Sequence, residues 1–257
     1  KQKQQERLHV FKQKYNNIVS ETNLTNYINH PFVFIITSYN NANWYNHNLD
    51  SVITQTYNNW RIIYVDDAST DKTYFLVKKY ILFNKLQHKF TLIKNKKNYK
   101  QGYSRYIAFK ECKDEEICCL LDGDDWLYNN EVLQNLNNFY NKINVWITYG
   151  KYMVYENGKN TRVTGYREFP NDIIQRKTYQ HYSIWTSVHL RTGFAKLFKS
   201  YPYEYLLDFN NELISASTDQ NEMFWALYHS QGKHKNTNFI TLVYNKDASL
   251  ECSNSYY

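Results

Sequence analysis

The chain has 257 residues, of which 42% are hydrophobic and 21% are charged, and its formal net charge at pH 7 is +7. This length and composition suit one globular domain with a sizeable core and exclude a largely disordered chain. No apolar run reaches the ~18 residues that a membrane span needs, and no signal peptide is visible, so we expect a cytoplasmic protein without a membrane span.

The positive charge does not point to a nucleic-acid partner, because much of the excess lies in one segment. Residues 94–110 carry six basic side chains and directly precede an acidic cluster. A basic segment beside acids suits a small phosphorylated ligand with a metal ion, and we expect no nucleic acid. The four cysteines form no CxxC pair, which argues against a zinc site.

From residue 32 onward, apolar runs typical of strands alternate with segments of helical periodicity. Strands are expected over residues 32–39, 60–67, 90–95, 116–122 and 144–150, and helices over residues 43–56, 69–83, 103–112 and 130–140. This alternation predicts an α/β fold with a mostly parallel, Rossmann-like sheet and helices on both faces.

The alternation breaks down after residue 150. Residues 151–166 resemble a hairpin that turns at Asn157 and Gly158. Helices are expected over residues 191–200 and 219–229, and a closing strand over residues 238–245. The polar, helix-prone residues 1–30 suggest an N-terminal helical extension, followed by a single domain over residues 31–257.

Carboxylates follow the apolar strand in the stretch "CCLLDGDDWL", where Asp122, Asp124 and Asp125 lie close together. Because ligands of parallel sheets bind beyond the carboxyl ends of the strands, these acids and the second acidic strand end at Asp66 and Asp67 are expected at one rim. The spacing does not fit an EF-hand loop, and a solvated acidic turn is the plain alternative. The two acidic strand ends favour a divalent cation held by carboxylates and ligand phosphates.

Five motifs in this order carry a family resemblance: "FIITSYNN", "QTYNNWRIIYVDDASTDKT", "LLDGDDWL", "VHLRTGFAKLF" and "STDQNEMFWALYHSQGKHKNTNFITLVYN". They resemble family 2 glycosyltransferases of the GT-A fold, and in particular a subgroup found among giant viruses and some bacteria. The resemblance covers roughly residues 32–245. It implies a nucleotide-sugar half over about residues 31–150 and an acceptor half over about residues 151–250.

The resemblance also implies roles for individual residues on the donor side. Asp67 would accept a hydrogen bond from a uracil ring, and the D-x-D-type cluster would bind metal and ribose. The implied nucleotide-binding residues are Thr37, Tyr39, Asp67, Lys100, Arg105 and Asp122, and the implied metal ligands are Asp122, Asp124 and Asp125. A surface position for Lys100 and a helix-start position for Asp125 are the structural alternatives.

On the acceptor side the resemblance assigns the general base to Asp219, for which a helix cap is the structural alternative. His189 and Arg191 would contact the acceptor or the diphosphate. Trp126 would form a wall of the sugar pocket, or it would pack in the core.

The implied activity is a metal-dependent, inverting transfer from a UDP-sugar to a hydroxyl acceptor, with Mn²⁺ or Mg²⁺ as cofactor. The acceptor would be a glycan or a protein side chain such as collagen-like hydroxylysine. A viral member would act in the host cytoplasm or the virion, fused to or associated with another domain. The alternatives are a sugar-nucleotide nucleotidyltransferase and a non-catalytic nucleotide-sugar-binding module.

Overall fold

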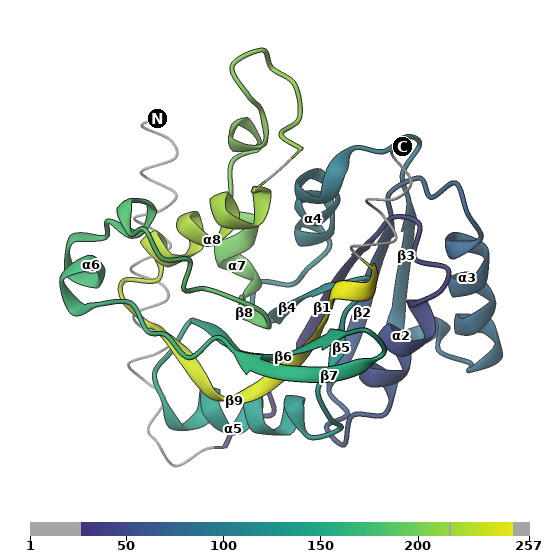
Figure 1. The fold of residues 1–257 in the computed structure, drawn as a ribbon, viewed down its shortest axis with the longest axis horizontal. Coiled ribbons are helices and arrows are strands. Elements are labelled where there is room, and N and C mark those ends of the chain that lie inside the picture. Colours follow the sequence, from purple (N-terminus) through teal and green to yellow (C-terminus); the bar gives the residue numbers. More distant parts are fainter. Residues whose placement is uncertain (1–26, 216, 249–257) are drawn as a thin grey trace.

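A computed structural model describes residues 27–215 and 217–248 (Figure 1). The expected extension over residues 1–30 therefore lies almost entirely outside the described residues. Within the described ranges, no helix is both long enough and apolar enough to cross a bilayer.

The first half of the domain is a parallel α/β unit. Its strands and helices are β1 (Phe32–Ser38), α2 (Tyr45–Ile53), β2 (Trp60–Asp66), α3 (Thr73–Phe83), the 3₁₀ helix η1 (Gln87–Lys89), β3 (Phe90–Lys94), α4 (Lys100–Lys110) and β4 (Ile117–Asp122). Strand β1 pairs in parallel with both β2 and β4, and β2 pairs in parallel with β3. The expected order of strands and helices in this half is confirmed.

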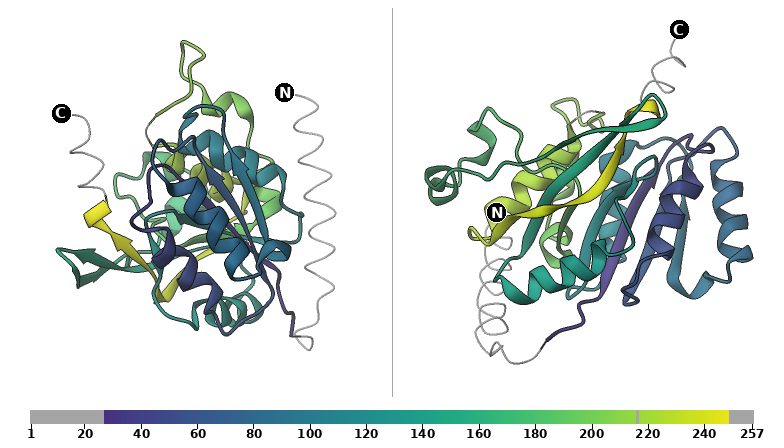
Figure 2. Two further views of the ribbon diagram at one scale, coloured as in Figure 1. Left: turned by 90° about the vertical axis from the view of Figure 1, so that its right-hand side faces the viewer. Right: turned by 60° about the horizontal axis from the view of Figure 1, so that its bottom comes forward.

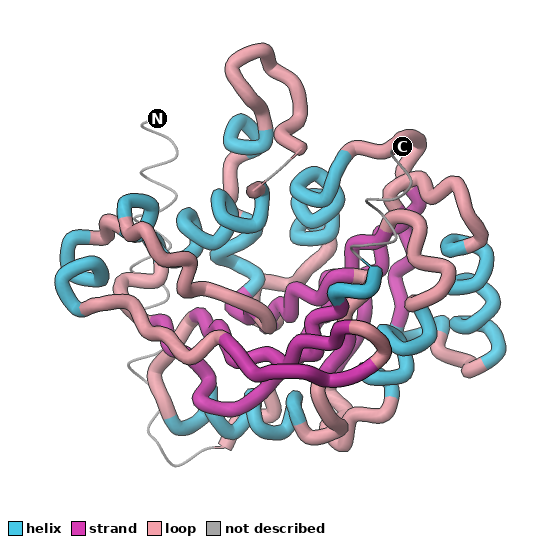
Figure 3. Tube along the Cα trace, viewed as in Figure 1, coloured by secondary structure: helices cyan, strands magenta, loops and turns pink. Residues whose placement is uncertain are grey.

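Alternate side chains of β1 enter two hydrophobic cores, one on each face of the sheet. Phe34 and Ile36 pack with residues of α2, α3 and the later helix α5 (Val132–Lys142). Val33 and Ile35 pack with residues of α4 and of two C-terminal helices, α7 (Ala195–Lys199) and α8 (Thr218–His229). Helices therefore cover both faces, as the period-2 pattern of a buried strand predicts (Figures 1 and 3).

The second half extends the same sheet with antiparallel and parallel pairs. Its remaining elements are β5 (Trp126–Leu127), β6 (Ile147–Glu156), β7 (Lys159–Thr164), α6 (Asn171–Arg176), η2 (Tyr179–His181), β8 (Arg191–Phe194), η3 (Tyr203–Leu206) and β9 (His234–Asn245). The strand order is β3-β2-β1-β4-β8-β6-β9-β5, and β7 pairs with β6. Figure 2 shows β6, β7 and β9 as long strands running side by side. The α/β class is confirmed, and the complete sheet is mixed.

Residues 191–200 do not form the expected single helix. Arg191–Phe194 is a strand between β4 and β6, and only Ala195–Lys199 is helical. Pairing with two strands supplies backbone hydrogen bonds that local sequence periodicity does not reveal. The expected hairpin is confirmed, but its first arm continues the expected strand over residues 144–150 as one element, β6. The closing strand is also longer than expected, because it begins at His234.

Truncating a core leucine should destabilise the domain more than truncating an exposed one. Leu49 of α2 is completely buried, whereas Leu82 of α3 is 53% exposed. We expect Leu49→Ala to lower the free energy of unfolding by about 2–5 kcal/mol, because it leaves a cavity. Leu82→Ala should change it by about 0.5 kcal/mol at most. Urea denaturation of both variants measures this difference, and equal losses would contradict the described packing.

Candidate active site

The polar ends of three neighbouring strands lie at one edge of the sheet. In the register of the parallel strands, Thr37 of β1 is opposite Asp122 of β4, and Ser38 is opposite Asp66 of β2. The backbone N–H of Asp67 donates to the carbonyl oxygen of Ser38 over 2.8 Å. The expected gathering of strand ends is confirmed.

The turn after β4 is held by a buried amide from α2. Asn48 Nδ2 donates to the backbone oxygens of Asp122 (2.8 Å) and Asp125 (2.7 Å). A side chain at Gly123 would place its Cβ 2.7 Å from the Cβ of Ser38, so the close approach of the two strand ends requires glycine there. These contacts fix the direction in which the acids of the turn point.

The two acids at the end of β2 have different environments. Asp67 Oδ1 accepts hydrogen bonds from Asn95 Nδ2 (2.7 Å) and from the backbone N–H of Tyr99 (2.9 Å), which holds this buried carboxylate in one orientation. Asp66 Oδ1 accepts from the N–H of Ser69, and burial raises the pKa of this carboxyl. Asp66 thus shapes the turn after β2.

A fully buried arginine joins the two halves of the site. Arg105 of α4 donates from Nη2 to Asp122 Oδ1 over 2.6 Å and from Nη1 to Glu222 of α8. Gln101 Nε2 also donates to Asp122 Oδ1 over 2.8 Å. Burial alone would raise the pKa of Asp122, but Arg105 and other nearby positive charge hold it below its usual value.

A second buried arginine, Arg191 of β8, lies at the same edge. Arg191 Nη2 donates to Asp219 Oδ2 over 2.8 Å, and its Nε donates to the backbone oxygen of Ser187. Asp219 is in the first turn of α8, whose N-cap position, Ser217, makes no side-chain capping bond. The carboxylate of Asp219 is therefore bound to a guanidinium group across the site.

Three side chains form a group that can hold a divalent cation. One ligand atom each from Asp122, Asp125 and His189 lies within 4.8 Å of the others. Asp125 Oδ2 and His189 Nδ1 are buried without a hydrogen-bond partner, which fits atoms meant for a ligand. Asp124 is outside this group, so the cluster contains two of the three acids expected from sequence, together with a histidine expected to contact the acceptor or the diphosphate.

The protonation of these groups reflects their burial. Burial, then the positive charge of Arg191, lowers the pKa of His189 to about 3, so its ring is neutral at pH 7 and able to bind a cation. Burial and the charge of Asp122 raise the pKa of Asp124 to about 7. Burial also raises the pKa of Asp125 well above its usual value. Without a cation, the turn cannot readily carry three negative charges.

The remaining residues expected at the site differ in their exposure to solvent. Thr37 is buried at the end of β1, Tyr39 is partly exposed just beyond it, and Lys100 is exposed at the first residue of α4. Trp126 follows Asp125 directly and its ring packs with aromatic neighbours, with centroid distances of 5.1 Å to Tyr155 and 6.2 Å to Trp44.

Sequence reasoning missed Glu222, which is buried and joined to Arg105. A signal was present, because Glu222 lies three residues after Asp219 and the two therefore share a side of the helix. Asn48 and Gln101 were also missed. Both are polar residues in ordinary helical segments, and only the fold brings their amides to the acidic turn.

Comparison with known protein families identifies a match. The model described as "Glycosyl transferase family 2" matches residues 33–207. The chain is also 27% identical over 227 residues to the Escherichia coli UDP-Glc:alpha-D-GlcNAc-diphosphoundecaprenol beta-1,3-glucosyltransferase WfaP, covering 86% of this chain and 80% of that protein. Over 184 residues it is 26% identical to glycosyltransferase GlyA of Streptococcus pneumoniae serotype 4, covering 67% of this chain and 25% of GlyA.

Solved structures with the same fold include TarS of S. aureus, residues 1–349, in complex with UDP. That structure superposes with a TM-score of 0.63 at 20% identity, and the match covers 84% of this chain. The UDP-GlcNAc complex of the same TarS fragment gives a TM-score of 0.61 at 21% identity over the same share of this chain. The match spans 60% of the TarS chain in the UDP complex and 58% in the UDP-GlcNAc complex.

Removing the buried guanidinium of Arg105 should cost far more stability than removing an exposed one. Arg105→Leu leaves Glu222 and Asp122 without their shared cation, and we expect a loss of about 3–5 kcal/mol. As a control, Arg162→Leu breaks a pair with Glu156 whose arginine is mostly exposed, with an expected loss of at most about 1 kcal/mol. Urea denaturation compares the two, and a small loss for Arg105→Leu would contradict its proposed role as a structural link.

Proposed function

Because the chain belongs to glycosyltransferase family 2, we propose that this glycosyltransferase uses a UDP-sugar, a divalent cation and an inverting mechanism to glycosylate a hydroxyl group. The observation that carries the proposal is the arrangement at the sheet edge. A group that can hold a cation, formed by Asp122, Asp125 and His189, shares one edge with the ion-paired acid Asp219.

We assign the donor to the half of the chain over about residues 31–150. The buried end of β1 at Thr37 and the fixed carboxylate of Asp67 would form the base pocket, and Asp67 would accept a hydrogen bond from uracil. Tyr39 and Lys100 complete the proposed nucleotide side, and the fully buried Arg105 would act there through Asp122, which it holds. The name of WfaP includes a UDP-sugar donor, and TarS binds UDP and UDP-GlcNAc, which supports UDP as the nucleotide here.

We assign the cation, Mn²⁺ or Mg²⁺, to Asp122, Asp125 and His189, with Asp124 close by. Two carboxylates and a neutral imidazole suit Mn²⁺ well, and carboxylates with phosphate oxygens suit Mg²⁺. When bound, the ion would offset the negative charge that builds up on the diphosphate as the bond to the sugar breaks. The burial of the unpartnered oxygen of Asp125 supports this assignment.

We assign the general base to Asp219, in the acceptor half over about residues 151–250. Its carboxylate would take the proton of the acceptor hydroxyl while that oxygen attacks the anomeric carbon from the side opposite the diphosphate. The ion pair with Arg191 would hold the carboxylate in position, because Arg191 is itself fixed by the backbone oxygen of Ser187. In-line attack of this kind inverts the anomeric centre.

The proposed acceptor is a hydroxyl of a glycan, and a protein side chain such as hydroxylysine is the second candidate. The name of WfaP specifies a lipid-linked GlcNAc as its acceptor, which favours a saccharide. Membership in the family argues against the nucleotidyltransferase alternative. The named relatives are bacterial, and the placement among enzymes of giant viruses, like the cytoplasmic location, stays a prediction.

Removal of the cation should weaken UDP binding. We expect EDTA to lower UDP affinity by about tenfold or more, and Asp125→Asn or His189→Ala to cause a similar loss at limiting Mn²⁺. Asp67→Ala should weaken UDP binding, but the binding should still depend on the cation, because the proposed partner of Asp67 is the uracil ring. Calorimetry of UDP binding with and without Mn²⁺ tests this, and equal affinity in EDTA would refute the cation assignment.

Asp219→Asn should separate catalysis from donor binding. The amide can still accept a hydrogen bond from Arg191 but cannot take a proton, so sugar transfer should fall by about 10²–10⁴-fold. UDP affinity should stay within about twofold, because this residue would act on the acceptor side. The measurement is UDP release from the UDP-sugar and acceptor found most active in a screen.

The alternative role for Asp219 is purely structural and gives a different outcome. If Asp219 serves only as the partner of Arg191, the Asp219→Asn variant should be less stable than the unaltered protein. Its rate of sugar transfer should then be close to that of the unaltered protein. Melting temperatures recorded beside the transfer rates decide between the roles. Near-normal transfer by the folded variant would remove Asp219 from the chemistry.

A further inference from the structure

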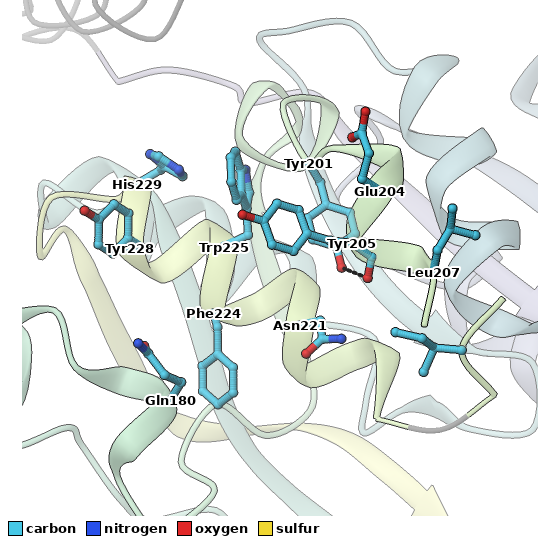
Figure 4. Close-up of a pocket in the computed structure, with 11 residues that line it drawn as sticks. Gln180, Tyr201, Glu204, Tyr205, Leu207, Asn221, Phe224, Trp225, Tyr228 and His229 are labelled. Carbon is cyan, nitrogen blue, oxygen red and sulfur yellow. Dashed lines mark hydrogen bonds between the residues drawn. The ribbon is translucent and has the colours of Figure 1, made fainter. Parts of the chain in front are cut away.

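An open pocket of about 480 Å³ lies against the outer side of α8 (Figure 4). This volume is within the range of about 300–1,000 Å³ that is usual for small-ligand sites. Its walls come from α8, from the 3₁₀ helices η2 and η3, and from the segment that links η3 to α8. None of the acids of the candidate active site lines it.

The outer side of α8 has an unusual composition for a surface helix. Phe224, Trp225 and Tyr228 line the pocket at helical spacing, while Met223 and Ala226 on the inner side are buried in the core. A surface helix normally presents polar side chains to solvent. Aromatic side chains gathered around a concave surface indicate a binding site.

The aromatic wall is held in place by hydrogen bonds. Trp225 Nε1 donates to Ser200 Oγ over 2.9 Å, and the hydroxyl of Tyr201 donates to the backbone oxygen of Tyr205 over 3.1 Å. The ring of Tyr205 is 5.7 Å from that of Trp225, and Tyr205 is 56% exposed. The wall is thus a preformed aromatic surface that remains accessible.

The polar groups of the pocket select the chemistry of its ligand. None of the lining residues is Lys or Arg and Glu204 lines the pocket, so His229 is the one lining side chain that can carry positive charge, which disfavours an anionic ligand. The ammonium group of Lys177 lies 5.0 Å from the centroid of the Tyr228 ring, but Lys177 is not among the lining residues. A hydrocarbon chain would remove water from Glu204, Asn221 and Gln180 without replacing its hydrogen bonds.

A neutral saccharide can contact both the aromatic rings and the polar side chains that line the pocket. The C–H groups on one face of a sugar ring pack on aromatic rings, and its hydroxyls pair with planar carboxylate and amide groups. Asn221 lies two residues after Asp219, so the pocket begins about 3 Å further along the axis of the helix that carries the candidate base.

We propose that this pocket binds saccharide units of the acceptor that precede the reacting sugar. The proposal rests on the proposed function, because it treats α8 as the helix that presents both the candidate base and the acceptor chain. It narrows the acceptor from a glycan or a protein side chain to an oligosaccharide. The pocket would raise affinity for longer acceptors without touching the donor.

The test uses the full chain on an array of neutral oligosaccharides of two to six hexose or N-acetylhexosamine units. The pocket variants are Tyr205→Ala and Asn221→Ala, and two variants are used in case one of them folds poorly. The matched control is Tyr203→Ala, which alters a 39%-exposed tyrosine in the same 3₁₀ helix that does not line the pocket. Calorimetry of UDP binding with Mn²⁺ is recorded for every variant.

We expect the unaltered protein and Tyr203→Ala to bind the same oligosaccharides, and the pocket variants to bind them about tenfold more weakly, as when an aromatic anchor is truncated. UDP affinity should be equal in all four proteins. Absence of oligosaccharide binding, or equal binding by folded pocket variants, would overturn the proposal.

Vesicles of phosphatidylcholine containing a polyprenyl phosphate test the competing occupant. Capture of these vesicles by the unaltered protein that is lost in Tyr205→Ala would assign the pocket to a lipid chain and also overturn the saccharide proposal. Failure of the unaltered protein to bind UDP would instead count against the proposed function. Oligosaccharide binding would in that case still be judged by the pocket variants alone.

Discussion

Two guanidinium groups, those of Arg105 and Arg191, are buried where the two halves of the domain meet, and the site depends on how their charges are matched. Arg105 joins Asp122 at the end of β4 to Glu222 of α8, and Arg191 of β8 joins Asp219 of the same helix. A buried cation without a partner is costly, so each arginine requires its acids to stay near. The position of α8 relative to the sheet is thereby tied to the acids of the turn.

The same pairing leaves an electrostatic imbalance at the turn itself. Asp122 is held ionised by its arginine, whereas burial and neighbouring charge raise the pKa of both Asp124 and Asp125. The buried Oδ2 of Asp125 faces the site without a partner, close to a neutral His189. A divalent cation would resolve this imbalance, because it supplies the positive charge that the turn lacks and binds atoms that nothing else satisfies.

The sequence predicts the parallel half well because its signals are local. Each strand there is an apolar run that ends in polar residues, and the buried alternation along β1 sets which helices lie on which face. The sequence-based prediction fails at Arg191–Phe194. This segment is a strand because it pairs with β4 and β6, not because of its local conformational preference. Arg105 and Glu222 are 117 positions apart in the sequence, so the residues next to either of them do not predict the ion pair.

Helix α8 carries residues of both proposed sites. The inner side packs Met223 and Ala226 into the core and directs Glu222 at Arg105, which leaves little freedom for the helix to move. The outer side carries Trp225, whose ring packs with those of Tyr201 and Tyr205. Rigid attachment on one side is what makes the other side usable for recognition: a ligand held by the outer rings would have a fixed position relative to Asp219.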